Sequence, residues 1–132
     1  MEALEMVRME DFAHRQIGEL SGGQQQRVFM ARALAQGSDI LLLDEPFAGV
    51  DAATERAILE VLERAKRSGK TLVVVHHDLS SAAEYFDKLM LIKQRLYAYG
   101  DPGAVLQEDL LSEVYEGRLR IFRDVLEKEA PR

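Results

Sequence analysis

Hydrophobic residues along the chain alternate between short uninterrupted runs and stretches with helical spacing. Residues 40–43 and 71–75 are branched and apolar with almost no polar face, which is typical of fully buried strands in a parallel sheet. Between them, residues 52–67 carry apolar side chains at helical spacing, with Asp51 as a candidate N-cap and a stop at 68–69. Strand, helix and strand in this order predict a βαβ unit with parallel strands, and therefore an α/β fold.

The other elements follow from the same spacing and from turn residues. We expect no internal repeat and no heptad run. The predicted elements are helices over 24–36, 80–86 and 109–115, strands over 88–92 and 95–99 joined at Lys93-Gln94, a turn at Asp101-Pro102-Gly103, and a frayed tail over 128–132.

Composition narrows the class of protein. The 132 residues are 47% hydrophobic and 30% charged, which are globular proportions for a single domain. The net charge of −6 argues against a protein that coats nucleic acid, which needs a basic face. The absence of cysteine excludes disulfides and thiolate metal sites, and no apolar run approaches the ~20 residues of a membrane span. We therefore expect a soluble intracellular protein.

The first candidate for chemistry is the segment Ser21-Gly22-Gly23-Gln24, at the start of the predicted helix over 24–36. A helix N-terminus offers unpaired amides and a positive dipole end, and glycines allow a phosphate to approach closely. The alternative is an ordinary serine N-cap followed by a flexible turn, which the segment alone would favour.

The second candidate is the pair of carboxylates that follows the strand over 40–43. Asp44 and Glu45 are predicted to lie at the carboxyl edge of a parallel sheet, where such folds bind ligands. Asp44 could hold Mg²⁺ and Glu45 could orient or deprotonate a water molecule. The alternative, in which both acids cap the next element and Pro46 ends the strand, is the weaker interpretation.

The third candidate is His76-His77-Asp78, directly after the strand over 71–75. Two histidines and an aspartate suggest a metal site, but adjacent residues leaving a strand point to opposite sides. A single histidine at this place is better suited to contact a phosphate or a water molecule.

Together these motifs resemble those of ATP-binding cassette (ABC) ATPases, in the same order along the chain. The resemblance extends from about residue 17 to residue 117. The matching positions are the signature motif at 20–24 with 26–28, the Walker B strand at 40–45, the D-loop at 48–51, and the switch histidine His77 followed by Asp78-Leu79.

The resemblance implies ATP and Mg²⁺ as cofactors and a role for each motif residue. Asp44 would position Mg²⁺, Glu45 would polarise the attacking water, and His77 would contact the γ-phosphate. In this family two domains pair head to tail, with ATP between the phosphate loop of one and the signature of the other. The remaining nucleotide-binding positions implied are Ser21, Gly22, Gly23, Gln24 and Asp51.

A narrower resemblance covers residues 12–20, 24–29 and 44–52, which look like importers of manganese, zinc or chelated iron. It implies a second ATPase subunit, identical or different, and integral membrane permeases as partners. A metal-binding substrate protein would act indirectly, nucleic acid is not expected, and the subunit would sit on the cytoplasmic face of the cell membrane. Non-transport ABC proteins fit less well, because they carry long coiled coils or an Asn-His-Leu-Asp D-loop.

The chain departs from the family pattern in one respect. The phosphate loop, Gly-x-x-x-x-Gly-Lys-[Ser/Thr], does not occur: Gly69-Lys70-Thr71 is the only candidate, and Arg64 stands where its first glycine is required. The aromatic adenine platform and the Q-loop glutamine are also missing. We therefore expect a partial P-loop NTPase-like domain, with residues 1–36 ending the helical subdomain and residues 37–132 carrying Walker B, D-loop, switch histidine and C-terminal elements.

Two functions remain open on this basis. The first is the ATPase component of a metal importer, inactive by itself and dependent on a phosphate loop supplied elsewhere. The second is a non-catalytic remnant or regulatory module that docks on an intact ABC ATPase. In the second case the two apolar strands would expose surface, because parallel sheets need both faces covered.

Overall fold

The computed structural model describes residues 1–115, and these pack as two compact units. The first unit is Met1–His76 and the described part of the second is residues 77–115, each with a hydrophobic core of its own. The α/β class with a parallel sheet is confirmed.

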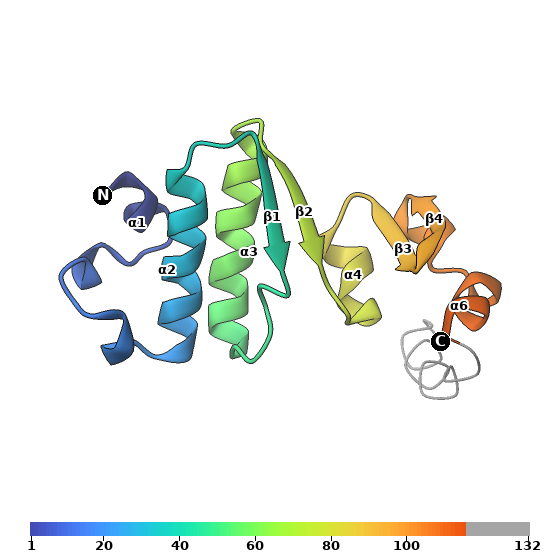
Figure 1. Ribbon diagram of the computed structural model, residues 1–132, viewed down its shortest axis with the longest axis horizontal. Helices are drawn as coiled ribbons and strands as arrows, with labels where there is room; N and C mark the ends of the chain where they lie inside the picture. The colour runs from blue at the N-terminus through green and yellow to red at the C-terminus, as the bar shows by residue number, and fades with distance from the viewer. Residues whose placement is uncertain (116–132) are drawn as a thin grey trace, which may run out of the picture. The chain divides into compact units, whose positions relative to one another are not determined.

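The first unit is a layered arrangement of helices and a two-stranded sheet. Figure 1 shows helix α3 between helix α2 and the β1–β2 sheet, with α1 beside α2. Its elements are α1 (Glu2–Met6), the 3₁₀ turns η1 (Glu10–Phe12) and η2 (Ile17–Glu19), α2 (Gly22–Ala35), β1 (Ile40–Asp44), α3 (Ala52–Arg67) and β2 (Thr71–Val75).

The predicted βαβ unit is confirmed in order and direction. Strands β1 and β2 pair in parallel, from Ile40 opposite Thr71 to Asp44 opposite Val75. Helix α3 begins after Asp51, as predicted, and a glycine with φ of 92°, Gly69, follows its C-cap. A positive φ strains any residue with a Cβ, so this glycine allows the chain to reverse into β2.

The core of the first unit forms around the apolar face of α3. Four residues of this helix are buried at one-turn spacing, so a single face packs against both neighbouring layers. The buried residues of this core are Val7, Met9, Leu20, Met30, Ala31, Leu34, Leu41, Ile58, Val61, Leu62 and Ala65.

The prediction that both strands are fully buried is wrong. In β1, Leu41 is buried, but Ile40 is 60% exposed and Leu42 is 76% exposed. Successive side chains of a strand point to opposite faces, and within the described residues α3 covers only one of them. The sheet therefore has one packed face and one apolar exposed face, the latter including Val75 of β2.

The second unit is a β-hairpin with short helices. Leu91 of its hairpin forms a core with Val105, Leu111 and Val114. The elements of this unit are α4 (Leu79–Tyr85), β3 (Leu89–Lys93), β4 (Arg95–Gly100), α5 (Pro102–Val105) and α6 (Glu108–Tyr115).

Two local predictions in the second unit need correction. The segment predicted as a turn is the start of α5, with Asp101 at the N-cap and Pro102 in the first turn, because proline's fixed φ suits a helix start. The strands are joined through Gln94 alone, whose φ is 60°, since Lys93 still pairs with Arg95. The other predicted boundaries agree with the structure to within two residues, and the predicted frayed tail lies outside the described residues.

The unequal faces of the sheet predict unequal costs of side-chain truncation. Ile58→Ala should lower the free energy of unfolding by about 2–5 kcal/mol, because Ile58 is fully buried under the sheet. Leu42→Ala should change it by no more than about 0.5 kcal/mol, because Leu42 is exposed. Urea unfolding of the 132-residue chain measures both, and equal costs would contradict this division of the sheet.

Candidate functional site

The N-terminal end of α2 is capped by its own side chains. Ser21 Oγ accepts a hydrogen bond from the amide of Gln24 (3.2 Å), and the Gln24 side chain accepts one from the amide of Ser21 (2.9 Å). The N-cap interpretation of Ser21 is therefore right. The amides of Gly22 and Gly23 donate to no acceptor within residues 1–115, so two N–H groups at the positive end of the helix dipole remain available to an anion.

The two glycines of this segment differ in their surroundings. A Cβ on Gly22 would meet nothing within 4 Å, whereas a Cβ on Gly23 would lie 3.0 Å from the side chain of Thr54. Gly23 therefore lets the first turn of α2 approach the first turn of α3 closely. The sequence pattern indicates close approach of a phosphate, but this packing role becomes visible only in the folded chain.

The two predicted carboxylates lie at the carboxyl end of β1, with Asp44 as its last residue and Glu45 directly after it. Asp44 is exposed and lies on the sheet face away from α3, the face that carries Leu42. Glu45 has a φ of 46°, a left-handed conformation that is uncommon for residues with a Cβ. Its amide donates to Val75 O (2.9 Å) and its carbonyl accepts from Ala48 (3.0 Å), so β2 and the following turn hold it in this conformation.

Asp51 is the N-cap of α3 at the end of the same loop. Its carboxylate accepts a hydrogen bond from the amide of Thr54 (2.7 Å), and this bond holds the pKa of Asp51 below its ordinary value. The positive charge of Arg27 contributes in the same direction. The candidate D-loop residue is therefore engaged as a charged helix cap.

Two further residues of α2 lie at this site without a role predicted for them. Gln26 Nε2 donates to the carbonyl of Pro46 (3.1 Å), in a partly buried position. Arg27 Nη1 donates to Val7 O (3.4 Å), while its buried Nε has no partner in the described residues. Both belong to the stretch that resembles the extended signature motif, which is the signal by which sequence reasoning could have found them.

The three residues after β2 take up different environments. The ring of His76 packs edge-on against Phe47 (5.6 Å between centroids), and His77 is exposed. The Asp78 carboxylate accepts hydrogen bonds from Ser80 N (2.9 Å) and from serine hydroxyls as the N-cap of α4. Across residues 1–115, no three His, Cys, Asp or Glu side chains gather as a metal site would require.

The first unit thus brings most of the predicted site residues onto linked segments. The α2 N-terminus, the bend at Glu45 and the N-cap of α3 are joined by the Gln26–Pro46 hydrogen bond and the Gly23–Thr54 contact. His77 is the first residue of the second unit.

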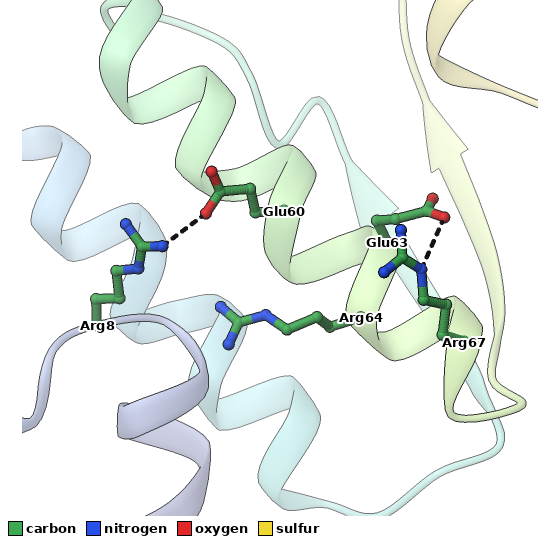
Figure 2. Close-up of a pocket in the computed structure, with 5 residues that line it drawn as sticks. All are labelled: Arg8, Glu60, Glu63, Arg64 and Arg67. Atoms are coloured by element: carbon green, nitrogen blue, oxygen red, sulfur yellow. Dashed lines mark hydrogen bonds and ion pairs between the residues drawn. The ribbon is translucent and has the colours of Figure 1, made fainter.

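A pocket of about 310 Å³ lies elsewhere on α3 and contains none of these residues. Figure 2 shows the Arg8–Glu60 (2.9 Å) and Arg67–Glu63 (3.4 Å) ion pairs in it, and Arg64 donates to Met6 O (2.6 Å). Its lining residues are therefore bonded to the protein itself. They are Arg8, Glu60, Glu63, Arg64 and Arg67.

Comparison with known proteins decides the family. The model of the family described as "ABC transporter" matches residues 1–48. A manganese transport system ATP-binding protein, MntB of Bacillus subtilis (strain 168), is 55% identical over 122 residues, which are 92% of this chain and 49% of that protein. The chain belongs to the ABC transporter ATPase family.

Other members agree with this placement. The zinc transport system ATP-binding protein TroB of Treponema pallidum (strain Nichols) is 54% identical over 118 residues, or 89% of this chain and 44% of that protein. MJ1267, an ATP-binding cassette of an ABC transporter solved in its ADP conformation, superposes with a TM-score of 0.74 at 31% identity, covering 89% of this chain and 48% of that one. The chain spans about half the length of the curated relatives it matches.

The depressed pKa of Asp51 predicts a specific pH dependence for this ABC ATPase segment. The carboxylate should stabilise the fold fully above its ordinary pKa of 3.8, and this contribution should be lost as pH falls through the lower folded value. Asp51→Asn keeps a capping side chain without the charge. Wild type should therefore be the more stable protein near neutral pH, and the difference should shrink between about pH 5 and pH 2 in denaturant unfolding. A difference that does not change with pH would contradict this role.

Proposed function

We propose that this chain forms the signature and Walker B portion of an ATPase subunit that powers transport of manganese or zinc. The main support is the bend at Glu45, where a strand of a parallel sheet ends in two carboxylates. The two available amides at the start of α2 are the second support. The relatives that are named as manganese and zinc transport subunits support the choice of these two metal ions as the cargo. The phosphate loop would come from a segment outside this sequence.

In this proposal Asp44 binds the metal ion and Glu45 acts on the attacking water. Mg²⁺ is held in proteins by one or two carboxylates, with phosphate oxygens and waters completing its octahedron, so the single exposed Asp44 fits it. When bound, the ion neutralises charge on the phosphates. Glu45 orients and deprotonates the attacking water, because its carboxylate can accept a proton and its backbone is held at the end of β1 by hydrogen bonds with Val75 and Ala48.

The amides of α2 act on the nucleotide of a second subunit. Ser21, Gly22, Gly23 and Gln24 would contact the γ-phosphate there, through unpaired amides and the helix dipole. Asp51 would border the same nucleotide. His77, which follows β2 in the chain, would contact the γ-phosphate bound to its own subunit.

The partners follow from this role. A second ATPase subunit would complete each nucleotide site. Permease subunits would form the path through the membrane, and a metal-binding substrate protein would deliver the metal ion to them. The ATPase subunit would then lie on the cytoplasmic side of the membrane. None of the helices within residues 1–115 is long and apolar enough to cross a bilayer. The division of the chain into the end of a helical subdomain (residues 1–36) and a Walker B portion (residues 37–132) remains a prediction from the motifs.

The exposed sheet face supports a second candidate function. Ile40, Leu42 and Val75 form an apolar surface that could dock on an intact ABC ATPase without catalysis. This function predicts stable binding of the 132-residue chain to a complete relative and no gain of activity when a phosphate loop is added.

The catalytic proposal is tested by joining the chain to a phosphate-loop-bearing segment of an ABC ATPase relative. The 132-residue chain alone should not hydrolyse Mg·ATP, whereas the joined cassette should. In that cassette Glu45→Gln should lower kcat by at least about a hundredfold, because the amide cannot accept a proton from water. Phosphate release measures both.

The matched control is Glu63→Gln, a similar exchange on the exposed side of α3 that should leave kcat unchanged. Failure of the joined cassette to hydrolyse Mg·ATP, although folded, would refute the catalytic proposal. Equal losses in the two variants would refute the role of Glu45.

A further inference from the structure

Gln26 makes a long-range hydrogen bond at the candidate site. Its Nε2 donates to Pro46 O at 3.1 Å, across 20 residues of sequence and in a partly buried position. Pro46 is fully buried and directly follows Glu45. A side chain of α2 thus binds the loop after β1 at Pro46, the residue next to Glu45.

The neighbouring glutamines bond to other segments. Gln24 closes the cap with Ser21, and Gln25 Nε2 donates to the carbonyls of Ile17 (3.1 Å) and Leu20 (3.0 Å) before the helix. Three consecutive glutamines therefore reach three different places. Only Gln26 among them reaches the loop between β1 and α3.

The bond connects the two chemically distinct parts of the site. Gln26 lies one helical turn after Gly22, and side chains on a helix lean toward its N-terminus. Its carbonyl partner belongs to a proline, whose ring fixes φ, so holding that carbonyl also restricts ψ of Pro46 and thereby the backbone directly after Glu45. The strained φ of Glu45 persists only if such contacts define it.

We propose that Gln26 is a positioning residue that holds the bend at Glu45 in register with the amide end of α2. This inference rests on the proposed ATPase function. Gln26 acts through its hydrogen bond to Pro46 on the direction of the Glu45 carboxylate. It therefore couples the signature helix to the carboxylate within one subunit.

The first experiment needs no ATP. In the 132-residue chain, amide hydrogen exchange at Ala48 reports the bend, because this amide donates to Glu45 O (3.0 Å). Gln26→Met, which keeps length but not the donor, should accelerate exchange at Ala48 about tenfold. Gln26→Lys restores a donor and should restore protection, while amides inside α3 should stay unchanged in both variants.

Unchanged exchange at Ala48 in Gln26→Met would overturn the proposal. Faster exchange spread equally over α3 would also overturn it, since that result means general destabilisation. If Gln26→Met does not fold, the comparison is made between Gln26→Lys and Gln26→Glu. The donor-bearing lysine should protect Ala48 and the ionised glutamate should not, and equal protection would overturn the proposal.

The second experiment uses the joined cassette. Gln26→Met should lower kcat about tenfold to a hundredfold through misplacement of Glu45, and Gln26→Lys should recover it. The KM for ATP should stay within about twofold, because no ground-state contact is removed. The matched control is Gln107→Met, which removes a glutamine bond to Gly103 O in the second unit and should leave kcat unchanged.

The two experiments separate this inference from the proposed function. If the wild-type cassette does not hydrolyse ATP, the proposed function fails, while exchange at Ala48 still decides whether Gln26 holds the bend. If the cassette is active and Gln26→Met keeps the wild-type kcat, the positioning role is overturned.

Discussion

Burial of one face of α3 is the interaction on which the first unit depends. Ile58, Val61, Leu62 and Ala65 are buried on that face, between α2 and the β1–β2 sheet. Burial of a Val, Leu or Ile side chain stabilises a fold by about 1.5–3 kcal/mol. An exposed ion pair, such as those on the opposite face of this helix, contributes about 1 kcal/mol or less. The positions of both neighbouring layers follow from this contact.

The candidate site is built at the ends of these layers. Because α3 is held against the sheet, its N-cap Asp51 lies at the end of the loop that begins with Glu45. The close approach of Gly23 to Thr54 brings the amide end of α2 to the same place. Packing in the middle of the unit therefore determines which polar groups meet at its edge, and polar contacts such as the Gln26–Pro46 bond set their orientation.

On the outer face of the sheet, the apolar composition of β1 does not match its exposure. The run over 40–43 has the composition of a strand covered on both sides, yet Ile40 and Leu42 are exposed within residues 1–115. Such surface is unfavourable in water and prone to pairing, so the strand carries a sequence suited to more packing than these residues provide.

The sequence by itself determined the elements whose signals are local. These are the βαβ order, the N-cap at Asp51, the carboxylates after β1 and the serine cap before α2, because strand composition, helical spacing and caps act over a few residues. It also carried the family resemblance, since motif order survives in the chain itself. Only the tertiary structure decided which strand face is covered, that Gly23 packs on Thr54, and that Gln26 bonds to Pro46. These contacts join residues 20 or more positions apart, and no local window of sequence contains both partners.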